Sequence, residues 1–323
     1  MSPSRRRLLQ ATAPAVLAGL AGCTSDGFGN SDQSTEYTLS IDTIDASPTE
    51  HALYEPNDDA LFGDPARAAL AAIIPDGTHR TYGFTPLPED SYVAGESRYF
   101  QTDSAVTGRQ EMDRTLVRVE SLDDDAVGDS DSEDSGEGTG EESIHVDSLN
   151  RPSARVIKIL HSNSATRGAG ASADLLRDDA YVLRRPAERD SRLANGDLDG
   201  RVITMTEDGG FPYRVSVTTE SIRETEYTTQ AIPVADDEAG FREVVFAAEI
   251  DAELDGESLS RSARDLLDRA LGGEYTEATP LSTEYEAVLA ALGVATADDS
   301  LNGRLLWYGE QLYRYGLYIH QPE

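Results

Sequence analysis

Alternation of polar and apolar side chains predicts strands most clearly between residues 200 and 219. Every second residue in the later half of this stretch is aromatic or β-branched: Tyr213, Val215, Val217 and Thr219. This spacing is typical of a strand that buries one face. Asp208-Gly209 separates it from the apolar run at 201–206, and Asp-Gly is a strong signal for a tight turn. We therefore expect an antiparallel hairpin over 200–219.

Other segments have a similar strand pattern, at 37–43, 97–102, 114–121, 241–250 and 303–319. We expect 97–102 to pair with 114–121 as a second hairpin. The stretch 303–319 is long enough to contain both strands of a third.

Helical spacing of apolar residues predicts four helices, at 64–74, 151–161, 258–273 and 284–292. In the first, Asp64 can cap the helix, Pro65 suits its first position and Pro75 ends it. In the last, Thr283 and Glu286 match a capping box. Antiparallel hairpins packed with short helices make an α+β fold.

Three of these helices precede hairpins, so the chain could consist of repeated helix-hairpin units. Thr-Pro-Leu follows the first helix at 85–87 and the third at 279–281. The similarity between the copies is loose. Independent helices and hairpins would give much the same pattern, and both interpretations stay open.

Composition adds a strong negative charge. The 323 residues carry 60 acidic and 27 basic side chains, for a net charge of −33, and Lys158 is the single lysine. Such a charge repels the nucleic-acid backbone, so we expect no nucleic-acid partner. Residues 121–143 hold ten of the acids and no basic residue, which favours an extended, unpacked segment.

These features suggest five parts of the chain. We expect a signal peptide at 1–22, a flexible tether at 23–35 and a first α+β unit at 36–120. An acidic linker or loop insertion follows at 121–147, and an α+β region with two further helix-hairpin units at 148–323. Whether the acidic part separates two domains or extends from one as a loop stays open.

The N-terminus has the pattern of an export signal. Three arginines at 5–7 precede an apolar run at 8–22 that is too short to span a bilayer. Ser-Arg-Arg-Arg-Leu-Leu at 4–9 resembles the twin-arginine export motif, which assigns that role to Arg5 and Arg6. Leu-Ala-Gly-Cys at 20–23 resembles a lipobox, where a prolipoprotein is lipidated and cut before Cys23.

With its acidic composition and scarcity of lysine, the chain resembles lipoproteins of haloarchaea. The resemblance in motifs covers residues 4–23 only. It implies a protein anchored by lipid at Cys23 to the extracytoplasmic face of the cell membrane, with the membrane as its first partner. For the composition, the alternative is an ordinary acidic protein. For the motifs, the alternative is a chance N-terminal arginine cluster with a stray buried cysteine.

Aromatic residues gather near the C-terminus and are the best candidate ligand surface. Trp307, Tyr308, Tyr313 and Tyr315 could stack on sugars or other flat ligands if they share an exposed face. The alternative is that Tyr313 and Tyr315 belong to the inward face of a core strand together with Leu317 and Ile319.

Asn-Gly-Asp-Leu-Asp-Gly at 195–200 resembles the start of an EF-hand loop, so Asp197 and Asp199 are candidate calcium ligands. The twelfth position is Thr206 instead of the expected glutamate, and a plain polar turn is the alternative. No other cofactor is expected. The five histidines show no zinc spacing.

No nucleophile motif occurs in the sequence. We therefore expect a non-catalytic binding or structural module of the cell envelope, whose protein or glycan partners the sequence does not identify. The alternative is an extracytoplasmic hydrolase with a site built from scattered histidines and carboxylates, which a pocket containing both would favour.

Overall fold

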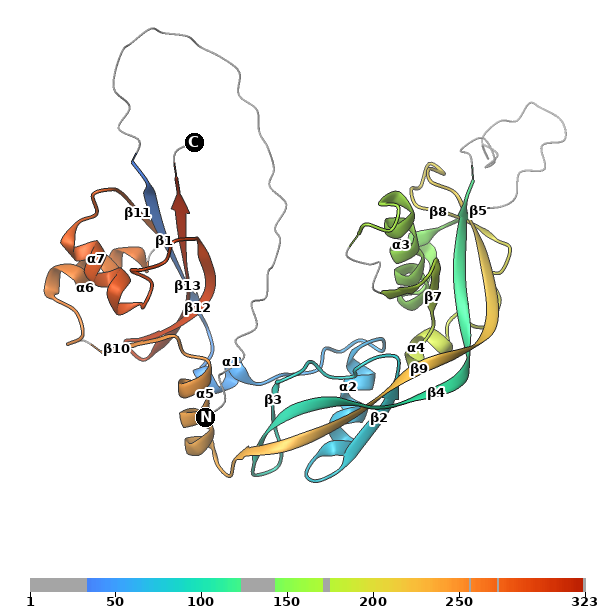
Figure 1. Cartoon of the computed structure of the whole chain (residues 1–323), viewed down its shortest axis with the longest axis horizontal. Coiled ribbons are helices and arrows are strands. Elements are labelled where there is room, and N and C mark those ends of the chain that lie inside the picture. Colours follow the sequence, from blue (N-terminus) through green and yellow to red (C-terminus); the bar gives the residue numbers. More distant parts are fainter. Residues whose placement is uncertain (1–33, 123–142, 171–174, 256, 272, 322–323) are drawn as a thin grey trace, which may run out of the picture.

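The computed structural model describes residues 34–122, 143–170, 175–255, 257–271 and 273–321. These residues form seven α-helices and thirteen strands in two sheets, which confirms the predicted α+β class. A long two-stranded ribbon connects a lobe at one end to a second lobe at the other (Figure 1). None of the described helices has the length and apolarity that a membrane span requires.

The first lobe contains a five-stranded sheet in the order β10-β12-β13-β1-β11. Its strands are β1 (Glu36–Ile44), β10 (Ala252–Leu254), β11 (Glu274–Ala278), β12 (Leu301–Tyr308) and β13 (Gln311–His320). Helices α6 (Arg261–Ala270) and α7 (Thr283–Ala291) cover one face. Leu39 and Ile41 of β1 lie in the core beneath them, as the alternation in 37–43 predicts.

The ribbon consists of β4 (Tyr99–Ser121) and β9 (Tyr213–Ala235), which pair antiparallel along their whole length. The predicted strands 97–102 and 114–121 are therefore the two ends of one strand, and the expected hairpin between them was wrong. The polar residues between them do not break the strand, because they bond across the ribbon. Ser104 and Thr229 hydroxyls lie 2.8 Å apart, as do those of Thr107 and Thr228.

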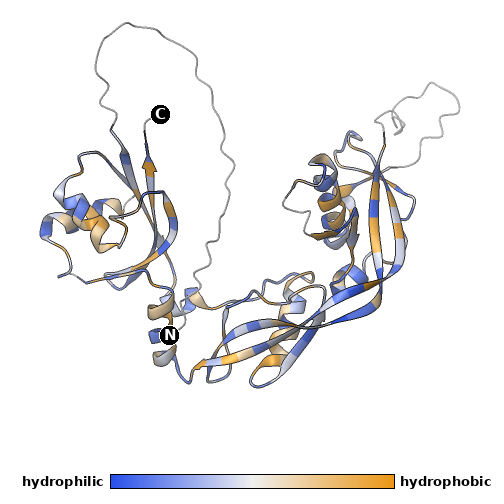
Figure 2. Ribbon diagram, in the orientation of Figure 1, coloured by the Kyte–Doolittle hydropathy of each residue, from blue (hydrophilic) through white to orange (hydrophobic). Residues whose placement is uncertain are grey.

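Figure 2 colours the middle of this ribbon mostly as hydrophilic. Its apolar side chains gather towards the ends, where helices pack on it. The register shifts between Tyr99 and Phe100 and between Val106 and Gly108. Such bulges bend a strand and increase its twist.

The second lobe is built on the far half of the ribbon. Its sheet has the order β5-β8-β9-β4-β7-β6, with short strands β5 (Ser143–His145), β6 (Leu176–Arg177), β7 (Ala180–Val182) and β8 (Val202–Thr204). The hairpin predicted over 200–219 is present, because β8 pairs antiparallel with the start of β9. Helix α3 (Arg151–Ala165) buries Val156, Ile157 and Leu160 against Val117 and Val215 of the ribbon.

The near half of the ribbon carries α1 (Pro48–Ala52), α2 (Gly63–Ile73), β2 (Thr78–Tyr82), β3 (Tyr92–Ala94) and α5 (Glu238–Ala248). The strand predicted at 241–250 was wrong, because this segment is α5. Asp237 caps the helix by accepting from Gly240 N at 2.8 Å. Phe241 and Val245 are both buried, one helical turn apart, and this spacing outweighs the β-branched composition.

All four predicted helices are present. They are α2, α3, α6 and α7, of which α7 occupies 283–291. The cap of α7 differs from the expected capping box. Ser282, not Thr283, is the N-cap, and its hydroxyl accepts from Tyr285 N at 3.2 Å. This register places Tyr285, Val288 and Leu289 in the core.

Strand pairing joins segments from both sides of the acidic segment. Strand β1, near the start of the predicted first unit, pairs with β11 and β13 of the C-terminal region. Both α2-β2 and α6-β11 lead into Thr-Pro-Leu, but the chain then continues differently in each. The helix-hairpin repeat therefore fails in its first copy, which lacks a hairpin.

Several predictions fall outside the described residues. These are the signal peptide with Arg5 and Arg6, lipidation at Cys23, and almost all of the tether. Most of the acidic segment, 123–142, also lies outside them. The residues on either side end β4 and begin β5, two strands of the same sheet.

Candidate functional site

The four aromatic residues proposed as a ligand surface lie on two faces of the five-stranded sheet. Tyr315 is 1% exposed, and its hydroxyl donates to Leu292 O at 2.8 Å. Tyr308 and Tyr313 pack against the same core beneath α6 and α7. Trp307 instead meets Phe246 of α5 edge to face, with ring centroids 5.7 Å apart. Strand alternation therefore separates Trp307 from the three tyrosines, and the four rings do not share one surface.

The two candidate calcium ligands lie in a turn before β8. Asp197 and Asp199 are exposed, and Asp199 Oδ1 accepts from Val217 N at 2.8 Å. In the described part of the chain, no group of three or more metal-ligating side chains is close enough to hold an ion. Asp199 thus links the turn to β9, as a polar turn would.

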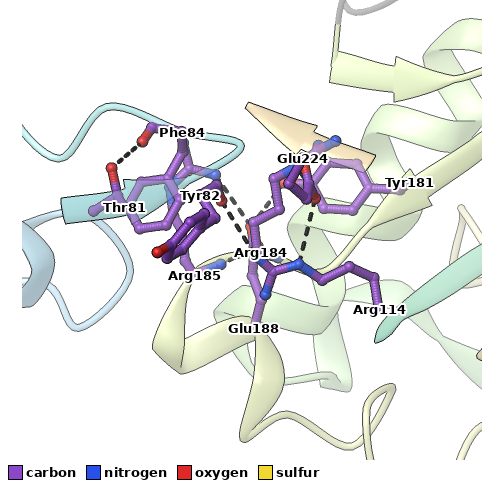
Figure 3. A network of polar contacts seen from close by, with 9 residues as sticks. All are labelled: Thr81, Tyr82, Phe84, Arg114, Tyr181, Arg184, Arg185, Glu188 and Glu224. Carbon is purple, nitrogen blue, oxygen red and sulfur yellow. Dashed lines mark hydrogen bonds and ion pairs between the residues drawn. The ribbon is translucent and has the colours of Figure 1, made fainter. Parts of the chain in front are cut away.

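The most strongly buried charges of the described residues lie elsewhere, where α4 (Pro186–Arg189) meets the middle of the ribbon (Figure 3). Glu224 on β9 is 3% exposed and lies between two arginines. Its Oε1 lies 2.9 Å from Arg184 Nε and 3.3 Å from Arg114 Nε. Arg114 also donates to Tyr82 O at 3.2 Å, which ties β2 to the ribbon.

Glu188 of α4 is a second buried carboxylate beside the first. It accepts from the backbone N–H groups of Arg184 and Arg185, each at 2.9 Å, and from the Tyr181 hydroxyl at 2.7 Å. Arg155 on α3 donates to that hydroxyl, also at 2.7 Å. These bonds fix the segment 184–188 against both α3 and the ribbon.

Each buried glutamate therefore has two arginine partners. Glu224 pairs with Arg114 and Arg184, while Glu188 pairs with Arg185 at 3.3 Å and Arg155 at 3.8 Å. Burial lowers the pKa of the Arg114 guanidinium, although adjacent Glu224 opposes this effect. Burial also raises the pKa of Tyr181, and the neighbouring Glu188 adds to the shift. The cluster has a local excess of positive charge inside a strongly acidic chain.

Gly83 lets the chain approach this cluster closely. Its φ of 77° is in the left-handed region, and its N–H donates to Thr225 O at 2.8 Å. A Cβ at this position would lie 2.3 Å from Arg184 Nε and 2.4 Å from Glu224 Oε2. Glycine therefore allows the chain to pass beside this ion pair, and the next residue, Phe84, contacts the Arg185 guanidinium.

A pocket of about 230 Å³ opens beside this cluster. Its walls come from the loop before α2 and the first turn of that helix, from the loop between β2 and β3, and from the residue that precedes α4. The lining residues are Tyr54, Phe62, Pro65, Phe84, Thr85, Pro86, Leu87, Pro88 and Arg185. The guanidinium of Arg185 lies 4.9 Å from the Phe62 ring centroid and 5.4 Å from that of Phe84. We call this the arginine-aromatic pocket.

A second pocket, of about 240 Å³, lies between the first lobe and the ribbon. His51 of α1, Asp90, Tyr92 and Glu249 line it, together with apolar residues. Burial lowers the pKa of His51 and raises the pKa of Glu249, and a neighbouring charge supports each shift. The structure thus brings a histidine and two carboxylates to one cavity. We call this the histidine pocket.

Sequence reasoning missed both pockets, because their residues are far apart in the chain. Phe62, Phe84 and Arg185 belong to three separate loops. The only available signal was Thr-Pro-Leu at 85–87, which we treated as a mark of repetition and which forms part of a pocket wall. Comparison with protein-family models, with curated proteins and with solved structures finds no match to this chain.

Proposed function

We propose that this protein is a lipid-anchored binding module of the extracytoplasmic membrane face, and that it takes its ligand in the arginine-aromatic pocket. The observation that carries the proposal is the position of Arg185 at the pocket wall, where its guanidinium contacts the rings of both Phe62 and Phe84. Ligand pockets typically combine apolar walls with a few fixed polar groups. The twin-arginine motif and the lipobox support the location.

The pocket is stiff for a site made of loops. Pro65, Pro86 and Leu87 are buried in its walls, and Glu188 anchors the backbone of Arg185. A rigid site loses less conformational entropy when a ligand binds. The rings, prolines and single guanidinium of this pocket therefore support ligand binding instead of catalysis.

Nuclear magnetic resonance can test this role on the purified full chain, with a panel of small aromatic acids and amides. We expect shifts in the amide signals of residues around the pocket, and we expect Phe84→Ala to abolish them by removing a wall. Phe211→Ala is the matched control, because Phe211 is 59% exposed and lies outside the pocket. Shifts that are equal in both variants would contradict the proposal.

The histidine pocket favours a second candidate function, an extracytoplasmic hydrolase. A neutral histidine could act as a base there, and a carboxyl group with a raised pKa could act as an acid. Turnover of nitrophenyl esters provides the test. Activity that His51→Gln and Glu249→Gln both remove would support the hydrolase, whereas activity that survives both would contradict it.

A further inference from the structure

We propose that the arginine-aromatic pocket selects a carboxylate attached to a small apolar or aromatic body. This inference rests on the proposed binding function and specifies its ligand. It follows from the donors of Arg185, from the charge behind the pocket, and from the size and character of the walls.

Most N–H donors of the Arg185 guanidinium are not used within the described residues. Among the described residues, its one hydrogen-bond acceptor is Glu188 Oε1, at 3.3 Å from Nη1. A guanidinium has five N–H donors in a planar fork that matches a carboxylate. The rings of Phe62 and Phe84 hold that fork in place, so its orientation is set before a ligand arrives.

The charge around the pocket favours an anion. Arg185 shares Glu188 with Arg155, and the adjoining Glu224 likewise has two arginine partners. An acid close to the opposite wall is Asp59: burial raises the pKa of Tyr54, and the charge of Asp59 adds to the shift. Asp59 is itself neutralised, because its Oδ2 lies 3.1 Å from Arg151 Nη1.

The walls define the rest of the ligand. Apart from Arg185, the polar side chains that line the pocket are the hydroxyls of Tyr54 and Thr85. Its 230 Å³ is below the range of pockets for drug-sized ligands, about 300–1,000 Å³, so it fits one ring or one branched side chain. Phosphate sites often gather successive backbone N–H groups at a helix N-terminus or a nest, whereas the side-chain N–H groups that line this pocket come from one residue, Arg185. The combination favours a carboxylate over a phosphate.

The carboxylate could belong to a free organic acid or to the C-terminus of a peptide. We therefore choose four probes for calorimetric titration of the purified full chain. They are phenylacetate, phenylacetamide, phenyl phosphate, and an acetylated tetrapeptide that ends in phenylalanine with a free carboxylate. Tighter binding of the tetrapeptide than of phenylacetate would identify a peptide terminus as the source, and the reverse would identify a free acid.

We expect phenylacetate to bind about tenfold or more tightly than phenylacetamide, because a charge-assisted hydrogen bond is stronger than a neutral one. We expect Arg185→Gln to remove this preference. Arg189→Gln should keep it, because Arg189 is exposed at the end of α4 and does not line the pocket. Arg185→Lys keeps the charge without the fork, and it should retain part of the preference.

Equal affinity for the acid and the amide would overturn the inference, while leaving a binding function in place. Tighter binding of phenyl phosphate than of phenylacetate would also overturn it. Absence of binding by all four probes would contradict both the inference and the proposed function. The comparison of probes uses the unmodified chain, so it stands even if Arg185→Gln proves unstable.

Discussion

At the scale of single residues, Gly83 should be unusually sensitive to substitution, because it combines a left-handed backbone with close approach to a buried ion pair. Gly83→Ala is expected to lower the free energy of unfolding by more than the 1–3 kcal/mol or so that backbone strain alone costs. The added Cβ would force Arg184 and Glu224 to move. Denaturant unfolding measures the change.

Gly196→Ala is the matched control for this prediction. Gly196 has a φ of 79°, close to the 77° of Gly83, but a Cβ there would meet nothing within 4 Å. The control therefore has the backbone cost without the collision. If the two variants lose equal stability, the close approach at Gly83 does not matter to the fold.

The buried tyrosines predict sensitivity to alkali. Burial raises the pKa of Tyr315 to about 12, above the value of about 10 in an unfolded chain. Its contribution to stability is full below pH 10 or so and is lost as the pH rises through the folded value. We expect the free energy of unfolding to fall by about 3 kcal/mol between these pH values on account of Tyr315.

Denaturant titrations at a series of pH values test this expectation. Tyr315→Phe should flatten the alkaline decline, though not fully, because burial also raises the pKa of Tyr285. Tyr318→Phe should leave the decline unchanged, since Tyr318 is 43% exposed. If Tyr315→Phe loses stability with rising pH as steeply as the unchanged chain, ionisation of Tyr315 does not cause the alkaline decline.

At the scale of elements, α5 shows how tertiary contacts decide a segment that its composition leaves uncertain. Phe241 is fully buried, stacks on Tyr99 with centroids 4.2 Å apart, and meets Tyr92 edge to face at 5.5 Å. Phe241→Ala is expected to lower the free energy of unfolding by about 3–5 kcal/mol. Equilibrium unfolding followed by circular dichroism gives the value.

Phe246→Ala on the same helix makes the comparison specific. Phe246 is only partly buried and contacts Trp307 and Arg242, so its loss should cost clearly less. An equal cost for both variants would mean that α5 docks no more firmly through Phe241 than through Phe246.

Local patterns were enough to predict some elements and not others. One-sided apolar spacing located α2, α6 and α7, although the N-caps expected at Asp64 and Thr283 are Phe62 and Ser282 in the structure. Asp-Gly located the turn between β8 and β9. The ribbon could not be predicted, because the polar middle of β4 has no apolar alternation and depends on pairing with β9, about a hundred residues away. Both pockets were inaccessible for the same reason, since long-range pairing assembles their walls.

At the scale of the whole molecule, the strongest prediction concerns location. We expect Cys23→Ser to release the protein from membranes, because the proposed lipid attachment needs the thiol. Fractionation of cells, followed by partition into detergent, measures the anchored share. Ser25→Ala is the control, since it alters a neighbouring polar residue and leaves the lipobox intact. Undiminished retention of Cys23→Ser in the membrane fraction would argue against lipidation.

The place of β1 between β11 and β13 has a consequence for biogenesis. A ribosome releases residues 36–44 early, yet both of their partner strands lie beyond residue 273. The five-stranded sheet can therefore close only after translation has passed β13, and its long-range contacts make closure slow. Until then, β1 presents two unpaired edges that could associate with other chains. A cell that makes this protein must keep the nascent strand shielded until synthesis is nearly complete.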